Sequence, residues 1–275
     1  MRFASVTYEG RPLAVAIDGE IATPLLDISE LGARTPAALL AHPPLYEKIQ
    51  LPVGVLHFRP VIPRPGKIIC VGLNYLEHVH EGTFERPEYP VFFTKFATAL
   101  TGPFDPIPRP PESEAVDYEG ELAIVIGEYA RRVPREQALS KIAGYTVAND
   151  VTMRDFQYKT HQWLQGKSWD GATPLGPYLV SPDEIQDLSS LALRTTVNGE
   201  LVQEASFSLL LFDLATLIAT LSVFTTLEPG DVILTGTPSG VGFRREPQLL
   251  LSDGDTVAVE IERIGRIENR IVDEA

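Results

Sequence analysis

"VDYEGELAIVIG", residues 116–127, places three carboxylates two residues apart and then continues through six uncharged positions. Because side chains alternate along a strand, Asp117, Glu119 and Glu121 are expected on one side of it, about 7 Å apart per pair. The apolar run that follows is typical of a strand buried on both faces. Taken alone, the carboxylates would mark a solvated strand end. At the mouth of a buried strand they need compensation, which a divalent cation with oxygen ligands supplies.

A second apolar stretch also ends in an acidic residue. In "GYTVANDVTMRD", residues 144–155, Asp150 stands where the apolar run stops. By itself it is an ordinary strand-end or helix-cap aspartate. Together with Glu119 and Glu121 it forms a three-carboxylate set from neighbouring strand ends, which suits Mg²⁺ or Mn²⁺ with open positions for a ligand. The single cysteine and the absence of an HExxH motif argue against a zinc site.

A candidate acid–base pair lies between these strands and the start of the chain. In "GLNYLEHVHEG", residues 72–82, a short helix would place His78 and Glu81 three apart on one face. The carboxylate could then orient the imidazole and stabilise its protonated form. His80 is an equally good candidate on composition, and a lone histidine is more often structural.

Two further stretches carry candidate site residues. Lys167 in "LQGKSWDG" could be partly enclosed because Gly166 and Trp169 flank it, although most lysines lie on the surface. The glycines of "TGTPSGVG", residues 235–242, could present backbone N–H groups to a carboxylate, and Thr237 could present a hydroxyl. The same residues also build a tight turn. A phosphate loop is excluded because no lysine completes the pattern.

The overall charge limits the possible partners. The 275 residues include 23 Lys and Arg against 37 Asp and Glu, which gives a formal net charge of -14. Such a surface repels phosphate backbones and anionic headgroups, so we expect neither nucleic acid nor a membrane as a partner. An anionic substrate would need a local island of positive potential or a bound cation.

The single cysteine and the apolar segments bear on location. Cys70 cannot form an intrachain disulfide and is interpreted as a small core residue, which favours a reducing, cytoplasmic setting. The chain opens without the apolar run of a signal peptide. The longest apolar stretch, residues 208–224, is broken by Asp213 and is too short for a membrane span. Its leucines follow helical spacing, which predicts a helix packed on a sheet.

The distribution of turns and apolar runs predicts the domain organisation. Prolines and a glycine in "RPVIPRPGK", residues 59–67, interrupt every regular pattern and mark a boundary or connector. The chain is accordingly divided into a small N-terminal domain, residues 1–60, and a catalytic domain, residues 61–275. Short β-branched runs outnumber helical patterns, which indicates a β-rich α+β fold rather than a doubly wound sheet.

Several of these stretches, taken in order, resemble the fumarylacetoacetate hydrolase superfamily. The resemblance covers about residues 61–272 and rests on "KIICVGLNYLEH..E", "VDYEGELAIVIG", "GYTVANDVTMRD.Q", "GKSWDGATPLGPYL", "VNGELVQ" and "LEPGDVILTGTPSGVG". It implies a mixed β-sandwich roll, a bound Mg²⁺ or Mn²⁺ and a homodimer. Residues 1–60 are similar to the small N-terminal α/β domain that many bacterial members carry.

The resemblance also implies roles for individual positions. It implies that the metal ligands are Glu119, Glu121 and Asp150, and that His78 and Glu81 form the dyad that activates water. It also implies that Lys167 faces the substrate. The substrate's carboxylate or oxo groups would be contacted by Arg154, Gln157 and Thr237. Asp117 is not a ligand in that pattern.

Three functions are compatible with these residues. The first is an acylpyruvase-type enzyme that hydrolyses a carbon–carbon bond in a β-diketo acid such as fumarylpyruvate. The alternative is decarboxylation of oxaloacetate or isomerisation of 2-hydroxyhepta-2,4-diene-1,7-dioate through the same metal-stabilised enolate. The third is a non-catalytic protein with a structural Ca²⁺, which would place Lys167 and His78 far from Glu119. The acyl group would depend on a lid near residues 78–90.

Overall fold

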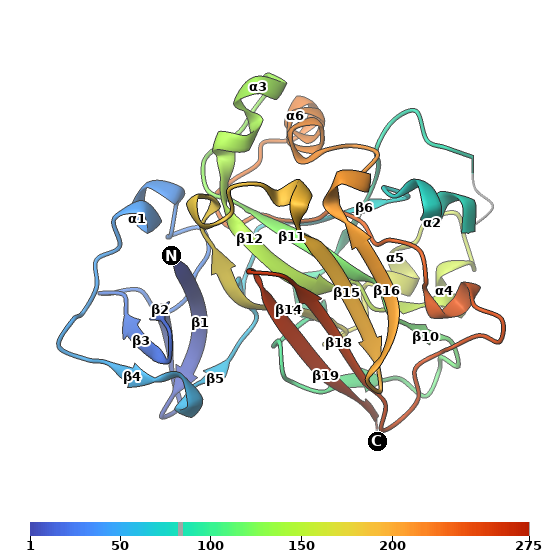
Figure 1. Cartoon of the computed structure of the whole chain (residues 1–275), viewed down its shortest axis with the longest axis horizontal. Coiled ribbons are helices and arrows are strands. Elements are labelled where there is room, and N and C mark those ends of the chain that lie inside the picture. Colours follow the sequence, from blue (N-terminus) through green and yellow to red (C-terminus); the bar gives the residue numbers. More distant parts are fainter. Residues whose placement is uncertain (82–84, 275) are drawn as a thin grey trace.

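The computed structural model describes residues 1–81 and 85–274, and strands dominate it (Figure 1). This confirms the predicted β-rich α+β class. The strands of the largest sheet are β1 (Arg2–Tyr8), β2 (Arg11–Asp18), β3 (Ile21–Pro24), β4 (Leu51–Pro52), β5 (His57–Phe58), β6 (Ile68–Gly72), β7 (Val91–Lys95), β8 (Leu100–Thr101), β11 (Gly120–Ile126), β12 (Ile142–Asn149), β14 (Thr173–Val180) and β17 (Val232–Leu234).

The largest sheet is mixed. In the described part of the chain it has 12 strands in the order β4-β3-β2-β1-β14-β12-β11-β17-β6-β7, with β5 paired to β1 and β8 paired to β14. β17 runs parallel to β6, whereas β11 is antiparallel to both of its neighbours, β12 and β17. β11 and β12 are thus paired on both sides within the sheet, which makes them a firm base for a site.

Two smaller sheets complete the strands. A five-stranded sheet has the order β16 (Glu200–Ser206), β15 (Ala192–Val197), β18 (Thr256–Ile261), β19 (Gly265–Asp273) and β9 (Ile107–Arg109). A two-stranded sheet pairs β10 (Val116–Asp117) with β13 (Thr152–Met153). Figure 1 shows the five-stranded sheet lying in front of β11 and β12, as a sandwich requires.

The helices are short. They are α1 (Ala37–Ala41), α2 (Leu76–Glu81), α3 (Arg135–Ala138), α4 (Arg154–Gln157), α5 (Leu164–Lys167) and α6 (Leu214–Phe224), with single 3₁₀ turns η1 (Val53–Val55), η2 (Ala97–Ala99), η3 (Leu139–Lys141), η4 (Pro182–Glu184), η5 (Leu188–Ser190), η6 (Phe207–Leu209) and η7 (Gly242–Arg244). In Figure 1, α3 and α6 lie together at one end of the sheets, and α2, α4 and α5 lie on the side away from the N-terminal strands. No helix among the described residues is long and apolar enough to cross a membrane.

The strand β11 is buried on both faces, as its apolar run predicts. Leu122 and Ile124 pack in a core with α6 and the five-stranded sheet, while Ala123 and Val125 pack in a second core with N-terminal residues. All four side chains are at most 2% exposed. Each large apolar side chain buried in this way contributes roughly 1.5–3 kcal/mol. The strand is thereby fixed in register, and so are the acidic residues at its start.

The acidic stretch before β11 differs from the sequence expectation. Asp117 does not share a strand with Glu121, because β10 ends at Asp117 and β11 begins at Gly120. β10 pairs with β13 instead. The break turns Asp117 away from the other carboxylates and toward Arg154.

The apolar stretch 208–224 is helical only in its second part. The helix α6 begins at Leu214, and the preceding leucines belong to a 3₁₀ turn and a loop. The expected helix over the whole stretch is wrong because Asp213 accepts a hydrogen bond from Thr216 N (2.9 Å) and caps the helix at this point. Arg135 on α3 also contacts the Asp213 carboxylate.

The cap predicts a measurable loss of stability. Asp213→Ala should lower the free energy of unfolding by about 1 kcal/mol at neutral pH. Thr216 and Arg135 outweigh burial and hold the pKa of Asp213 below its usual value. The carboxylate therefore stabilises the fold above its ordinary pKa, and the difference should disappear as the pH falls through the lowered value. Urea unfolding at a series of pH values from 7 down to 2 checks this, with the exposed Glu112→Ala as the control. Equal stability of Asp213→Ala and the wild type at pH 7 would contradict the capping role.

The N-terminal strands join the large sheet. β1 pairs with β14 through Arg2 and Phe3, so residues 1–58 are hydrogen-bonded to the rest of the molecule. The boundary near residue 60 stays a prediction. The expected lid near residues 78–90 includes residues 82–84, which lie outside the described part of the chain.

Candidate metal centre and catalytic pocket

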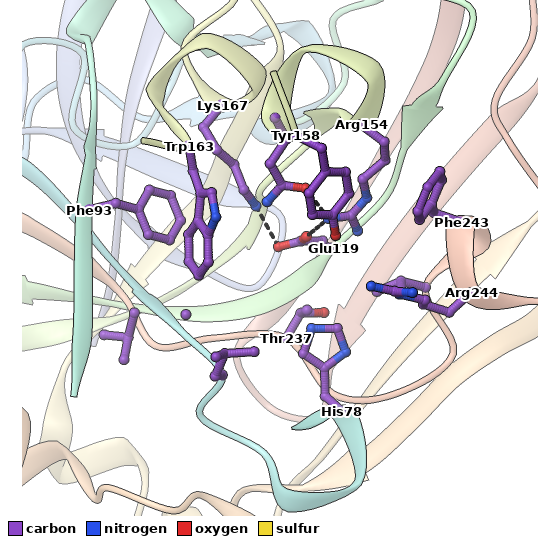
Figure 2. Close-up of a pocket in the computed structure, with 15 residues that line it drawn as sticks. His78, Phe93, Glu119, Arg154, Tyr158, Trp163, Lys167, Thr237, Phe243 and Arg244 are labelled. Atoms are coloured by element: carbon purple, nitrogen blue, oxygen red, sulfur yellow. Dashed lines mark hydrogen bonds and ion pairs between the residues drawn. The ribbon is translucent and has the colours of Figure 1, made fainter. Parts of the chain in front are cut away.

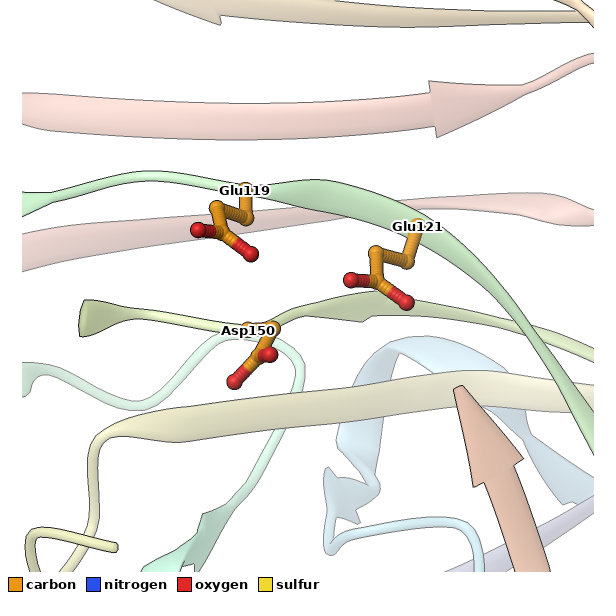
Figure 3. Close-up of side chains that lie close together, drawn as sticks. All are labelled: Glu119, Glu121 and Asp150. Atoms are coloured by element: carbon orange, nitrogen blue, oxygen red, sulfur yellow. The ribbon is translucent and has the colours of Figure 1, made fainter. Parts of the chain in front are cut away.

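The pairing of β11 with β12 brings the three predicted metal ligands together. Gly120 lies opposite Asn149, and Asp150 N donates a hydrogen bond to Glu119 O (2.8 Å). Glu119 and Glu121 are two residues apart, so their side chains leave the sheet on the same face. One oxygen from each of Glu119, Glu121 and Asp150 lies within 4.8 Å of the others. Figure 3 shows the three carboxylates turned toward one shared space.

Three buried cations surround these carboxylates. Lys167 Nζ lies 2.7 Å from Glu119 Oε2 and 2.8 Å from Asp150 Oδ2. Lys95 Nζ donates to Asp150 Oδ1 at 2.5 Å. Arg154 Nη1 lies 2.7 Å from Glu119 Oε1. All three cations are at most 4% exposed, so these ion pairs are desolvated and strongly coupled.

The protonation states follow from this arrangement. Burial alone would lower the pKa of Lys167, but Asp150 and Glu119 outweigh it and raise that pKa above its usual value. Burial would raise the pKa of Glu119, and the charges of Lys167 and Arg154 lower it instead. Burial, together with the charges of Asp150 and Glu119, raises the pKa of Glu121 well above its usual value. Glu121 is thus the carboxylate whose negative charge is least compensated.

The donor set fits a hard divalent cation. Glu121 is 1% exposed and accepts a hydrogen bond from Gly236 N at 2.7 Å. Among the described residues no Lys, Arg or His forms an ion pair with it. A buried carboxylate without a cation, beside two more carboxylates, is the oxygen-rich arrangement that Mg²⁺ or Mn²⁺ takes. Each carboxylate has about four acceptor sites, so the existing hydrogen bonds leave capacity for an ion.

The predicted acid–base pair is formed. In α2, His78 Nδ1 lies 3.2 Å from Glu81 Oε2, and Glu81 Oε1 accepts a hydrogen bond from Gly240 N at 2.9 Å. The carboxylate is therefore fixed on both oxygens, and the ring is held through Nδ1 with Nε2 left for a ligand. His80 on the same helix is exposed. The geometry therefore favours His78 over His80.

Lys167 reaches the carboxylates because α5 packs very closely on α4. A Cβ atom on Gly166 would lie 2.6 Å from Gln157 N and Cα, so only glycine allows this approach. The predicted enclosure of Lys167 is confirmed by its exposure of 2%. Its distance to Glu119 contradicts the structural-calcium alternative, which required the two residues to lie far apart.

The three predicted substrate contacts lie at the same cavity. Arg154 and Gln157 are on one face of α4, and Arg154 Nη1 donates to Gln157 Oε1 at 3.0 Å. Thr237 Oγ1 accepts a hydrogen bond from Gln203 Nε2 at 2.9 Å. All three lining side chains are at most 5% exposed.

One cavity collects most of the predicted site (Figure 2). Six of the nine predicted residues line it, namely His78, Glu119, Arg154, Gln157, Lys167 and Thr237. Of the other three, Glu121 and Asp150 lie beside Glu119, and Glu81 contacts His78. Aromatic side chains close the walls, and these are Phe93, Tyr158, Trp163 and Phe243.

Sequence reasoning missed two charged residues at the site. Lys95 holds Asp150, and its signal was a lone lysine in the apolar stretch "VFFTKF", residues 91–96. Arg244 lines the cavity from η7, and Figure 2 shows its side chain extending toward the space above His78. No motif distinguished Arg244 from the neighbouring Arg245.

Comparisons with known proteins agree on one family. The model of the fumarylacetoacetate (FAA) hydrolase C-terminal domain matches residues 67–272. A mitochondrial oxaloacetate tautomerase of Xenopus laevis is 48% identical over 213 residues, which cover 77% of this chain and 67% of the relative.

Two solved structures match along their full length. A 2-hydroxyhepta-2,4-diene-1,7-dioate isomerase from Mycobacterium marinum has a TM-score of 0.83 and 34% identity, covering 100% of this chain and 99% of that one. A fumarylacetoacetate hydrolase from Exiguobacterium antarcticum has a TM-score of 0.86 and 35% identity, covering 100% of both chains.

Proposed function

Because this chain belongs to the fumarylacetoacetate hydrolase family, we propose that it is an enzyme that interconverts the keto and enol forms of a 2-oxo diacid such as oxaloacetate. This is closer to the isomerase and decarboxylase alternative than to the hydrolysis of an acylpyruvate, which the motifs first suggested. The relatives named as oxaloacetate tautomerases and as a dienedioate isomerase support this order.

The metal ligands in this proposal are Glu119, Glu121 and Asp150. When bound there, Mg²⁺ or Mn²⁺ would supply positive charge beside the carboxylate and 2-oxo oxygens of the substrate, which makes the neighbouring C–H group more acidic. It would also supply the positive island that an anionic substrate needs on a protein with a net charge of -14.

The chain's own residues would bind and orient the substrate. The Arg154 guanidinium is a buried cation that lines the cavity in a fixed position, which suits a substrate carboxylate. Gln157 is locked to Arg154, so the two act as one binding surface. The charged Lys167 ammonium would donate a hydrogen bond to the 2-oxo oxygen, where negative charge develops when the adjacent carbon loses its proton.

The proton transfer falls to His78. Its Nε2 would take the proton from the carbon next to the 2-oxo group, and Glu81 would stabilise the imidazolium through Nδ1–H. The same proton would then be delivered to the 2-oxo oxygen to complete the enol, and the reverse order would give the keto form. No water is consumed in either direction.

The observation that carries this proposal is the convergence of different groups on one cavity. His78, Arg154 and Lys167 line it together with Glu119. A base, a carboxylate-binding group and a fixed cation beside an oxygen-rich metal site are the parts that enolisation of a 2-oxo acid requires. The test is the rate of enol-oxaloacetate ketonisation, followed by ultraviolet absorbance with and without Mg²⁺. A rate equal to that of buffer with Mg²⁺ would reject the proposal.

Arg244 favours a substrate with a second carboxylate. It lines the cavity on the side of His78, away from Lys167 (Figure 2). Arg244→Gln should raise the KM for oxaloacetate about 10-fold, the order of effect of losing one charged hydrogen bond. 2-Oxobutanoate lacks the second carboxylate. The rate at which the enzyme exchanges its protons for deuterium should therefore change less than about 3-fold in Arg244→Gln. Equal effects on both acids would contradict this role.

Hydrolysis of an acylpyruvate is the second candidate. The dyad favours it, because His78 held by Glu81 could equally take a proton from water. The Exiguobacterium antarcticum relative is named as a fumarylacetoacetate hydrolase. Fumarylpyruvate, acetylpyruvate and oxaloacetate should be assayed side by side for cleavage, decarboxylation and tautomerisation. Faster cleavage of an acylpyruvate than ketonisation of oxaloacetate would reverse the order of the two candidates.

The assembly and location of the protein are also proposals. We infer a homodimer from the family expectation, and light scattering after size-exclusion chromatography tests it. A reducing compartment such as the cytoplasm is favoured by the single cysteine, Cys70, which is buried and free. The Xenopus laevis relative is named as mitochondrial, so fractionation of cells that express the protein is the appropriate test.

A further inference from the structure

We propose that Asp117 is a positioning residue that aims the Arg154 guanidinium and the Gly242–Phe243 backbone at the substrate cavity. This rests on the proposed function, because Arg154 is taken as the group that binds the substrate carboxylate. The first carboxylate of the 116–127 motif has no role as a metal ligand or substrate contact, yet it is fully buried.

Asp117 joins two walls of the cavity through hydrogen bonds to both oxygens. On one side, Arg154 Nε donates to Oδ2 at 2.8 Å, and Nη2 lies 2.7 Å from the same oxygen. On the other side, Gly242 N donates to Oδ1 at 2.8 Å and Phe243 N donates to Oδ2 at 3.1 Å. Tyr118 N also donates to Oδ1 at 2.9 Å. One carboxylate therefore ties the start of α4 to η7.

These bonds decide which edge of Arg154 faces the site. Asp117 holds the Nε edge, so Nη1 is turned to Glu119 Oε1 (2.7 Å) and Gln157 Oε1 (3.0 Å). Without the Asp117 charge, Glu119 would be the remaining anion in contact with the guanidinium. Arg154 would then be held at its Nη1 end only, and the guanidinium would turn away from the position that binds a carboxylate.

The approach of η7 to Asp117 leaves no spare room. A Cβ atom on Gly242 would lie 1.9 Å from Leu249 O and 2.7 Å from Asp117 Oδ1. The loop is thus closed around the carboxylate, and the next residues, Phe243 and Arg244, line the cavity. Loss of the anchor would therefore loosen this wall as well as Arg154.

The test separates substrate binding from turnover. Asp117→Asn keeps the size of the side chain and removes its charge. We expect the KM for oxaloacetate to rise at least 10-fold while kcat changes less than 3-fold. Binding of glyoxylate, a 2-oxo acid with no carbon that can lose a proton, should weaken by a similar factor in calorimetry with the Mg²⁺-loaded protein. Mg²⁺ affinity should change less than 3-fold.

Asp231→Asn is the matched control. Asp231 is also fully buried, pairs with Lys67 (2.9 Å) and accepts from Glu228 N (2.8 Å), but it lies at the far end of β17 from the site. Asp231→Asn should lose about as much thermal stability as Asp117→Asn, but it should keep the KM and the glyoxylate affinity of the wild type. Equal binding changes in the two variants would mean a structural role only.

A double variant keeps the inference testable if Asp117→Asn fails to fold. Asp117→Asn/Arg154→Met removes both charges, so no unpaired buried charge is left between them. Its glyoxylate affinity should lie close to that of Arg154→Met alone, because the lost charge acts on Arg154, while an asparagine oxygen can still accept the hydrogen bond from Gly242 N. A further loss of 10-fold or more would overturn the inference. If the wild type neither binds glyoxylate nor acts on oxaloacetate, the proposed function is wrong. If the wild type binds glyoxylate and Asp117→Asn binds it equally well, only the positioning role of Asp117 is wrong.

Discussion

Removal of divalent ions should abolish ketonisation of enol-oxaloacetate, and Mg²⁺ or Mn²⁺ should restore it. The reason is that the carbon acid is too weak for a histidine base unless positive charge lies beside the 2-oxo oxygen. Lys167 alone does not supply enough charge, because Glu119 and Asp150 already accept two of its three N–H groups and offset its charge. The measurement is the rate after treatment with a chelator and after titration of each metal.

A ligand variant tests the same point without turnover. Glu121→Gln keeps the hydrogen bond from Gly236 N and removes one charge from the donor set. Metal affinity should fall on the order of 100-fold, because ligand charge sets the affinity of such sites. Calorimetry with Mg²⁺ measures it, and Asp231→Asn, a buried carboxylate at the other end of β17, is the control. Full activity of the metal-free protein, or unchanged affinity of Glu121→Gln, would contradict the assignment.

Replacing His78 should reduce kcat by about 10²–10⁴, the usual contribution of a positioned acid–base group. His78→Ala removes the proton carrier but touches none of the three metal ligands, so Mg²⁺ binding should stay within a factor of about 3 on the same energy scale. Rates with saturating Mg²⁺ and calorimetry of the same preparation give both values.

The chain offers a matched control for this variant. His80 lies on the same short helix and is exposed, so His80→Ala should retain the wild-type rate. The rate of Glu81→Gln should lie between the rates of His78→Ala and His80→Ala, because this variant leaves the His78 ring in place and removes the charge that stabilises the imidazolium. A normal rate for His78→Ala and a slow rate for His80→Ala would mean that His80, and not His78, transfers the proton.

Much of the fold and site could be predicted because the decisive patterns lie within single helices and strands. The apolar run 122–127 requires a strand buried on both faces, and the i, i+2 spacing of Glu119 and Glu121 requires a shared face. The i, i+3 spacing of His78 and Glu81 likewise needs only one helical turn. In each case the contact is set by the period of a single element.

The residues that sequence reasoning missed depend on contacts between distant elements. Lys95 meets Asp150 across 55 positions, because β7 and the end of β12 approach only in the folded chain. Asp117 lies outside the expected strand for the same reason, because its partners on α4 and η7 are 37 and 125 positions away in the sequence. The start of α6 was misjudged because the leucines before Asp213 have helical spacing, while the aspartate side chain caps the helix. Periodicity alone does not reveal which polar side chain ends an element.

The most direct test of the metal centre is a crystal structure of the protein soaked with Mn²⁺ and a 2-oxo acid, with the ion located by its anomalous signal. We predict an anomalous peak ligated by Glu119, Glu121 and Asp150, with the oxygens of the acid in the remaining positions and Arg154 at its carboxylate. Carboxylates that keep only their lysine and arginine partners, with no peak between them at saturating Mn²⁺, would contradict it.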